Sequence, residues 1–179
     1  QTGWLTVRLP EQNGLSTGGA YIDIMHRPHC LQTNCGQQTC GDQQMTEKHH
    51  GSCQCGAVTF EVTGRFDSFF LCHCQYCRKD TGSAYAANLF SRQAKLDWRS
   101  GRDKVVTYTV PDTRHEKSFC QTCGAAVPRE QFGGRLVVVP AGCLDSDLIK
   151  RPDAHIMLGS KAGWDDDLHE IERLDGLPE

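Results

Sequence analysis

Seven cysteines fall into three tight groups, and their spacing constrains the fold more than any other feature of the chain. The groups are Cys53 and Cys55, then Cys72, Cys74 and Cys77, then Cys120 and Cys123. Cysteines two positions apart would close a strained ring if they formed a disulfide with each other. The same spacings are typical of turns through which two thiolates hold one metal ion. The pattern therefore predicts metal centres rather than a disulfide framework.

The whole chain has eleven cysteines in 179 residues, an odd number that also argues against complete disulfide pairing. The N-terminal stretch QTGWLTVRLPEQ has no charged segment followed by an apolar run, so it does not match a secretory signal. Disulfides are rare in reducing compartments, where metal thiolates persist. We therefore expect a cytoplasmic protein with reduced cysteines.

Composition excludes two classes of partner. No apolar run approaches the ~20 residues that a membrane-spanning helix needs. The formal net charge of −3 gives no field that would attract a phosphate backbone. We expect neither a membrane nor a nucleic acid as a partner, and the oligomeric state is left open.

The chain divides into two kinds of sequence, residues 1–50 and residues 51–179. The first stretch lacks periodicity and is rich in Gln, Gly, Thr and His, which predicts a weakly ordered N-terminal extension. Its potential metal ligands are His26, His29, Cys30, Cys35 and Cys40. Cysteines five positions apart fit no common zinc turn, so we favour an unstructured segment over a third metal site.

From residue 51 onward the pattern predicts short strands separated by glycine-containing turns, in one domain of ordinary size. Val58, Phe60 and Val62 alternate with polar residues, as in a half-buried strand over 57–62. Further strands are expected within 84–90, 95–98, 104–110, 135–142 and 155–159. Only residues 75–82 read as a helical turn. The predicted fold class is mainly β, with small antiparallel sheets around a zinc-binding turn.

The two outer cysteine groups supply a complete ligand set. Zinc prefers four tetrahedral ligands, with Zn–S bonds of about 2.3 Å. Each pair is followed by a glycine, Gly56 or Gly124, which tolerates the tight backbone of such a turn. We predict one structural zinc, with the ligands Cys53, Cys55, Cys120 and Cys123. The alternative is a set of buried free cysteines.

The middle group, Cys72, Cys74 and Cys77, then supplies only three ligands. Three protein ligands and one exchangeable position are typical of catalytic zinc. Alternatively, a fourth ligand closes the site, or the group binds no metal in the free protein. The candidates for that fourth ligand are Cys143, His73, His115 and His155. Other pairings among the seven cysteines also remain open.

Five segments carry a resemblance to a known family. They are GSCQCGAVTFEV, CHCQYCRKDTGS, SFCQTCGA, VVPAGCLD and PDAHIMLGSKAGW, between Gly51 and Trp164. This arrangement closely resembles the glutathione-dependent formaldehyde-activating enzymes, whose domain (GFA) also occurs in centromere protein V. The resemblance implies a mixed β fold. It also implies a structural zinc on the two outer pairs and a catalytic zinc on Cys72, Cys74 and Cys77. The family pattern requires neither the extension nor a cysteine at Cys143.

The resemblance also implies a function. It points to a carbon-sulfur lyase activity that forms S-hydroxymethylglutathione from glutathione and formaldehyde. The expected partner is a small-molecule thiol, with glutathione as the first candidate. The expected cofactor is zinc, two ions per chain. The competing hypothesis from another class is a zinc-stabilised binding module in which the middle cysteines perform no chemistry.

Several other residues near the middle group have a functional and a structural interpretation. Arg78 follows the last cysteine and is expected to bind a glutathione carboxylate through a bidentate contact, or else to be a solvated surface arginine. His73 is expected to point away from the metal. Cys143 is expected to be a small buried residue. His155 and Trp164 either line a pocket or serve ordinary packing. The acidic segment 164–179 is expected to be solvated.

Overall fold

The computed structural model describes residues 47–178. The ligand candidates of the predicted extension, His26, His29, Cys30, Cys35 and Cys40, lie outside the described residues. The expected division at residue 51 falls inside the first strand, β1 (Lys48–Ser52). Among the described residues, no helix has the length and apolar character that crossing a membrane requires.

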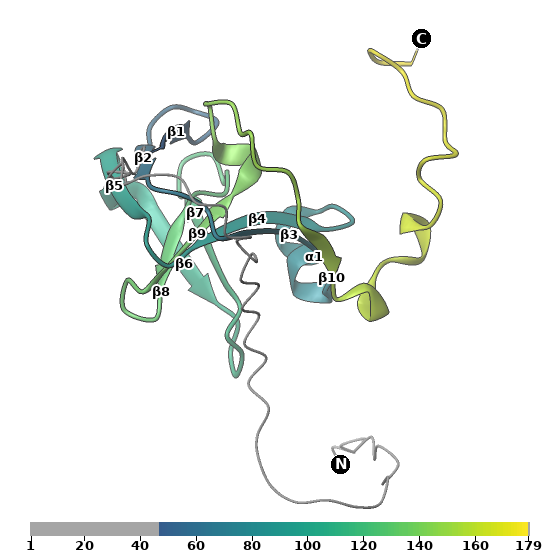
Figure 1. The fold of residues 1–179 in the computed structure, drawn as a ribbon, viewed down its shortest axis with the longest axis horizontal. Coiled ribbons are helices and arrows are strands. Elements are labelled where there is room, and N and C mark those ends of the chain that lie inside the picture. Colours follow the sequence, from purple (N-terminus) through teal and green to yellow (C-terminus); the bar gives the residue numbers. More distant parts are fainter. Residues whose placement is uncertain (1–46, 179) are drawn as a thin grey trace, which may run out of the picture. The chain divides into compact units, whose positions relative to one another are not determined.

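The mainly β prediction is confirmed, because the described residues form three small sheets (Figure 1). The first sheet consists of β1, β2 (Thr59–Thr63) and β5 (Lys95–Ser100). The second, in spatial order, consists of β10 (Ala154–Ile156), β3 (Ser68–Cys72), β4 (Ala86–Ser91), β9 (Leu136–Pro140) and β8 (Arg129–Gln131). The third pairs β6 (Val105–Thr109) with β7 (Glu116–Cys120). All pairings are antiparallel except that of β10 with β3.

The sequence pattern located part of this architecture. Strands β2, β4, β5, β6, β9 and β10 lie within or beside the predicted segments. The predicted helical turn is α1 (Gln75–Thr81), which ends at Gly82 with φ of 66°, a left-handed conformation that glycine adopts easily. Strands β1, β3, β7 and β8 were not predicted. Four short 3₁₀ turns complete the described part, η1 (Arg102–Lys104), η2 (Ala141–Cys143), η3 (Leu158–Ser160) and η4 (Gly163–Asp165).

The core has two clusters of buried side chains. The larger one is built mainly by alternating residues of β2, β3, β4 and β9, among them Phe60, Val62, Leu89 and Val139. The smaller one surrounds Cys53 and Cys120 with Val58 and Val127. The first predicted metal site is therefore partly embedded in the smaller apolar cluster. The middle cysteines lie elsewhere, at the end of β3 and at the start of α1.

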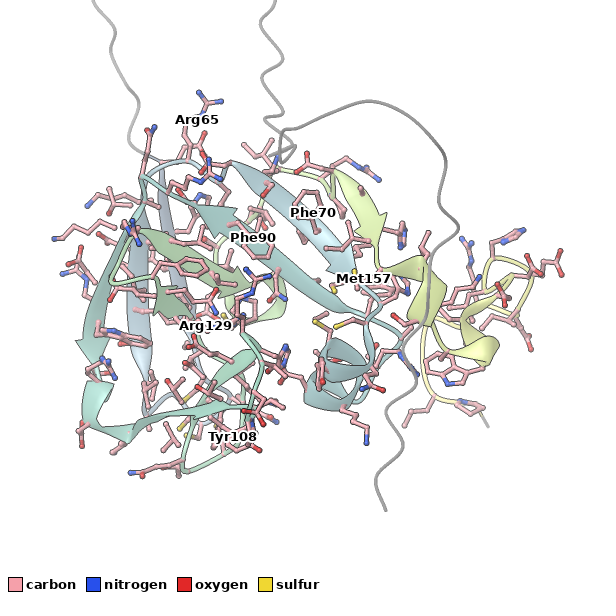
Figure 2. The ribbon with its side chains drawn as sticks, turned by 90° about the horizontal axis from the view of Figure 1, so that it is seen from below. Arg65, Phe70, Phe90, Tyr108, Arg129 and Met157 are labelled. Atoms are coloured by element: carbon pink, nitrogen blue, oxygen red, sulfur yellow. The ribbon has the colours of Figure 1, made fainter. Side chains whose placement is uncertain are left out.

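Strand β3 carries the start of the middle cysteine group and has different neighbours on its two faces. Leu71 is buried in the larger core, while Phe70 points to the opposite face and packs against Phe90 of β4, with ring centroids 6.0 Å apart (Figure 2). Side chains alternate along a strand, so Cys72 shares the face of Phe70. The cysteine group therefore begins on the face of the sheet that lies away from the core.

Candidate metal centres

The four outer cysteines come together as predicted. The ligand atoms of Cys53, Cys55, Cys120 and Cys123 all lie within 4.8 Å of one another. The Cys53 and Cys55 sulfurs are 3.5 Å apart, and those of Cys55 and Cys120 are 4.0 Å apart. Sulfurs bound tetrahedrally to one zinc ion at about 2.3 Å would be separated by about 3.8 Å. The donor set and its spacing therefore fit one tetrahedral metal ion.

Two similar turns build this four-cysteine group. The Gly56 N–H donates to the Cys53 carbonyl at 2.9 Å, and the Gly124 N–H donates to the Cys120 carbonyl at 2.8 Å. Both glycines have φ of 73°, which an L-residue adopts only with strain. Cys53 and Cys120 are buried at 2% and 0% exposure, while Cys55 is exposed. The turns thus present two sulfurs from the core and two from the surface.

The thiol pKa values in the four-cysteine group diverge. Burial opposes ionisation of Cys120, but backbone N–H groups of Cys123 and Thr122 outweigh it and lower its pKa to about 6. The backbone N–H of Ala57 favours ionised Cys55, yet the neighbouring thiols outweigh it and raise the pKa of Cys55 to about 11. Cys120 therefore ionises readily, whereas Cys55 keeps its proton. A bound cation would instead hold all four sulfurs as thiolates.

The middle cysteines also come together, in a second group. The sulfurs of Cys72, Cys74 and Cys77 lie within 4.8 Å of one another, and no histidine, acidic residue or further cysteine between 47 and 178 joins them. Cys72 ends β3, Cys74 is the N-cap of α1, and Cys77 lies in the helix. The Cys77 N–H donates to the Cys74 sulfur at 3.4 Å. The short loop between strand and helix thus places the three donors, which fit three positions around one metal ion.

The pKa values in this three-cysteine group also differ between thiols. Burial raises the pKa of Cys77 and of Cys72. Burial also opposes ionisation of Cys74, but the Cys77 backbone N–H and the two other thiols outweigh it and lower the Cys74 pKa. Cys74 is therefore the member that most readily becomes a thiolate.

The residues considered as a fourth ligand are engaged elsewhere. Cys143 is buried, its thiol donates to the Pro140 carbonyl at 2.9 Å, and burial raises its pKa to about 12. His115 stacks on Tyr76 and approaches Asp80 with its Nε2 at 3.5 Å. The Cys143 side chain also lines an open cleft of about 730 Å³ that none of the three middle cysteines lines.

His73 lies between two of the middle cysteines but points to other partners. Its side chain is 3% exposed, with Nδ1 at 2.6 Å from Oδ2 of Asp165 and Nε2 at 2.8 Å from Nδ1 of His155. The aromatic ring of Tyr85 packs on both imidazoles, with centroids 5.1 and 5.9 Å away. The His73 imidazole is therefore directed at Asp165 and His155, although the contact of Nδ1 with Asp165 does not have the geometry of a hydrogen bond. The expectation that the acidic segment is solvated was wrong for Asp165, whose side chain is only 5% exposed because His73 pairs with it.

Arg78 is half-buried beside the three-cysteine group. Its Nε is buried without a hydrogen-bond partner, and no acidic side chain between 47 and 178 pairs with it. Sequence reasoning missed a second guanidinium, Arg129 of β8 (Figure 2), which has the same kind of buried Nε. Burial lowers the Arg129 pKa, against the attraction of Asp80, Glu116 and Cys77. No local motif marks Arg129, since only the fold brings it near Cys77.

Comparison with known proteins supports a family assignment. The sequence model of the family described as "Glutathione-dependent formaldehyde-activating enzyme" (GFA) matches residues 48–160. A Halomonas elongata protein, named provisionally as a glutathione-dependent formaldehyde-activating enzyme, is 37% identical over 128 residues. The match covers 64% of this chain and 77% of the relative. A solved structure of a Rhodobacter sphaeroides protein aligns with a TM-score of 0.46 and 21% identity, over 59% of this chain and 98% of that one. The family match spans both cysteine groups, and on this ground the chain belongs to the glutathione-dependent formaldehyde-activating enzyme family.

Proposed function

We propose that the protein is a zinc-dependent enzyme that combines glutathione, or a related small thiol, with formaldehyde to form S-hydroxymethylglutathione. This is chemistry of the carbon-sulfur lyase class. The observation that carries the proposal is the three-cysteine group, to which residues 47–178 supply no fourth acidic, histidine or cysteine donor. Three protein ligands leave one coordination position for a substrate, as in catalytic zinc sites.

The two cysteine groups take different roles in this proposal. Cys53, Cys55, Cys120 and Cys123 would hold a structural zinc and tie the end of β1 to the end of β7. Cys72, Cys74 and Cys77 would hold the catalytic zinc. When bound there, zinc supplies positive charge that keeps the sulfur of a substrate thiol in its thiolate form at neutral pH. Each chain would thus carry two zinc ions.

The chemical step joins two small molecules. The substrate sulfur attacks the carbon of formaldehyde, a C–S bond forms, the π electron pair of the C=O bond moves to oxygen, and this oxygen takes up a proton. Glutathione and formaldehyde also combine without a catalyst. The protein therefore accelerates the reaction by holding the thiol in its reactive form and in the correct orientation.

Arg78 is the residue proposed to orient glutathione. Glutathione carries two carboxylates, and a guanidinium binds a carboxylate through two parallel N–H···O contacts. Arg78 directly follows Cys77, and its buried Nε has no partner. An incoming carboxylate would satisfy this donor and fix the distance between the peptide and the reacting sulfur.

A reducing compartment is needed for this chemistry, because the ligands and the substrate are thiols, and we propose that the protein works in the cytoplasm. The competing hypothesis, a zinc-stabilised module that only binds, differs in two measurable properties. It needs one tightly bound zinc, and it does not change the rate at which glutathione and formaldehyde interconvert with their adduct.

Exchange NMR of equilibrated glutathione and formaldehyde tests the proposal. It measures the rate at which the two molecules interconvert with their adduct, with and without zinc-loaded full-length protein. We expect acceleration above the uncatalysed background, a content of two zinc ions per chain by elemental analysis, and loss of acceleration in Cys74→Ser. Cys143→Ser is the matched control, since that thiol lies outside both groups, and should retain the acceleration. Exchange at the background rate with the zinc-loaded wild-type protein contradicts the proposed function.

A further inference from the structure

A small polar recess lies on the outer face of the second sheet, the face that also carries Phe70 and Phe90 (Figure 2). Residues of α1, β4, β7, β8 and β9 line it, among them Asp80, Lys117 and Arg129. Its volume is about 40 Å³. A cavity of this size has room for a small polar group such as a carboxylate.

The strand register places one wall of this recess beside the three-cysteine group. Ala86, which lines the recess, is the partner of Cys72 in the antiparallel ladder between β3 and β4. Side chains of paired residues lie on the same face of a sheet. Phe90, on that face of β4, pairs with Val138, which in turn pairs with Arg129. Cys72 and Arg129 therefore share the outer face of the sheet.

The helix places a second wall beside the same group. Asp80 and Thr81 line the recess and follow Cys77 by three and four positions in α1, a spacing that puts side chains on one helix face. The Thr81 hydroxyl donates to the Cys77 carbonyl at 2.9 Å. The recess is thus bordered by direct neighbours of two of the three middle cysteines.

Arg129 brings a positive charge to the recess without a close negative partner. Its Nε is buried without a hydrogen-bond partner, and no acidic side chain between 47 and 178 lies at ion-pair distance from it. The two nearby carboxylates are engaged elsewhere: Asp80 pairs with Lys117 at 2.8 Å, and Glu116 accepts from Gln131 at 3.0 Å. Since a half-buried charge is costly when unpaired, the recess is suited to an anionic ligand.

The recess is continuous with the open cleft of about 730 Å³ described above. The two share much of their lining, including Asp80, Thr81, Lys117 and Pro140. Sites for small molecules typically have volumes of about 300–1,000 Å³. A ligand of the size of a short peptide can therefore enter through the cleft and place one terminal group in the recess.

We propose that this recess is a carboxylate subsite, in which Arg129 binds the terminal glycine carboxylate of glutathione while the substrate sulfur lies at the three-cysteine group. This inference rests on the proposed function and names a determinant of its specificity. The other carboxylate of glutathione shares its carbon with an ammonium group, which Lys117 and Arg129 would repel. That carboxylate is left for Arg78. Thiols that lack an acid group at the glycine end should therefore bind poorly.

The first test compares two ligands on the zinc-loaded full-length wild type by calorimetric titration. The ligands are glutathione and its glycine monoethyl ester, which has lost the negative charge at that end. Because hydrogen bonds to charged groups are strong, we expect the ester to bind about 10- to 100-fold more weakly. Equal affinities for the two ligands would overturn the carboxylate subsite without the need for any variant.

The second test assigns this preference to Arg129. In Arg129→Gln, glutathione should bind about 10- to 100-fold more weakly than in the wild type, whereas the affinity for the ester should not change. A preference that survives in the variant, or an equal loss for both ligands, would overturn the role of Arg129. Arg129→Lys keeps the charge and should keep part of the preference, so it serves if the glutamine variant does not fold. Arg135→Gln, at an exposed arginine, is the control and should behave as the wild type.

The exchange assay separates this inference from the proposed function. A wild type that prefers glutathione to the ester but does not accelerate exchange contradicts the proposed function and leaves the carboxylate subsite in place. A wild type that accelerates exchange and binds both ligands equally overturns the subsite alone. A zinc-loaded wild type that binds neither ligand overturns both.

Discussion

The sulfurs of Cys55 and Cys120 lie 4.0 Å apart, although 65 positions separate the two residues in the chain. Cys55 belongs to the turn after β1, whereas Cys120 is the last residue of β7. The four-cysteine group therefore joins two sheets that share no strand pairing. A metal ion there would act as a cross-link between them.

Cys120→Ser should unfold the domain or lower its melting temperature strongly. Structural zinc contributes on the order of 10 kcal/mol in small metal domains, and Cys120 is the fully buried ligand. Circular dichroism melting and zinc content measure the effect. Cys143→Ser removes another buried thiol but keeps a donor for the Pro140 carbonyl, so it should melt close to the wild type. Equal melting of both variants would contradict the structural role.

Cys74→Ser should leave a folded protein that contains about one zinc ion fewer. Serine is a favoured N-cap residue, so it can accept from the Cys77 N–H in place of the sulfur and preserve α1. The reduced ligand set then binds metal weakly. Circular dichroism and elemental analysis on the same sample separate the two effects. Unfolding as severe as that of Cys120→Ser would show that both groups are structural.

Arg78→Lys should weaken glutathione binding, because an ammonium cannot reproduce the two-pronged contact. Hydrogen bonds to charged groups contribute about 1.5–3 kcal/mol, which corresponds to roughly a 10- to 100-fold loss of affinity. Calorimetric titration of the zinc-loaded protein gives the affinity. Lys79→Gln is the control, since it removes the adjacent exposed cation. A larger loss of affinity in Lys79→Gln than in Arg78→Lys would show that Arg78 is not the residue that binds the carboxylate.

Gly51→Ala should destabilise the protein by about 1–3 kcal/mol, the usual cost of overpacking. A Cβ at this position would lie 2.1 Å from Cζ of Phe60 and 2.4 Å from the backbone oxygen of Cys143. Urea denaturation measures the change. At Gly142 an added Cβ would meet nothing within 4 Å, so Gly142→Ala is the matched control and should be nearly neutral.

Glu61→Gln should change how stability depends on pH. Burial opposes ionisation of Glu61, but ion pairs with Lys48 at 3.3 Å and Arg99 at 2.8 Å outweigh it and lower its pKa. Because the folded-state pKa lies below the unfolded one, the stabilisation is complete above the unfolded value and disappears as the pH falls through the folded value.

Near neutral pH the variant should therefore have a lower melting temperature than the wild type. On acidification its melting temperature should fall by less than that of the wild type. Melting curves from neutral to acidic pH measure both quantities. Glu130→Gln, an exposed residue with no ion pair between 47 and 178, is the control and should follow the wild type. Parallel curves for Glu61→Gln and the wild type would rule out this source of acid sensitivity.

The sequence predicted the two cysteine groups because metal ligands in tight turns have a local signature. Cys72 ends β3, and Cys74 and Cys77 lie at the start of α1 two and five residues later, so their meeting requires no distant pairing. The pairing of Cys53 with Cys120 is long-range. It could still be predicted, because two cysteine pairs together supply the four ligands of one tetrahedral site. That these groups bind zinc, and that one is catalytic, stays a prediction.

Strand prediction succeeded where alternation was clear and failed where it was not. In β2, Phe60 and Val62 face the core as expected. In β3, the continuous run Phe69, Phe70 and Leu71 carries no period of two, because Phe70 packs on Phe90 on the outer face.

The contact between Asp165 and His73 could not be read from the sequence either. Acidic residues near a chain end are usually solvated, and only the parallel pairing of β10 with β3 brings this one to a buried histidine. Long-range pairing of this kind depends on the whole fold, not on any local pattern.

The separation of Cys55 from Cys120 along the chain also has a consequence during synthesis on the ribosome. The turn with Cys53 and Cys55 leaves the exit tunnel well before its partner turn exists, so for that interval two thiols wait without their partner ligands. They are then open to oxidants and to competing soft metals such as copper. If these cysteines bind zinc, as proposed, a reducing environment would protect the two early thiols until β7 has emerged.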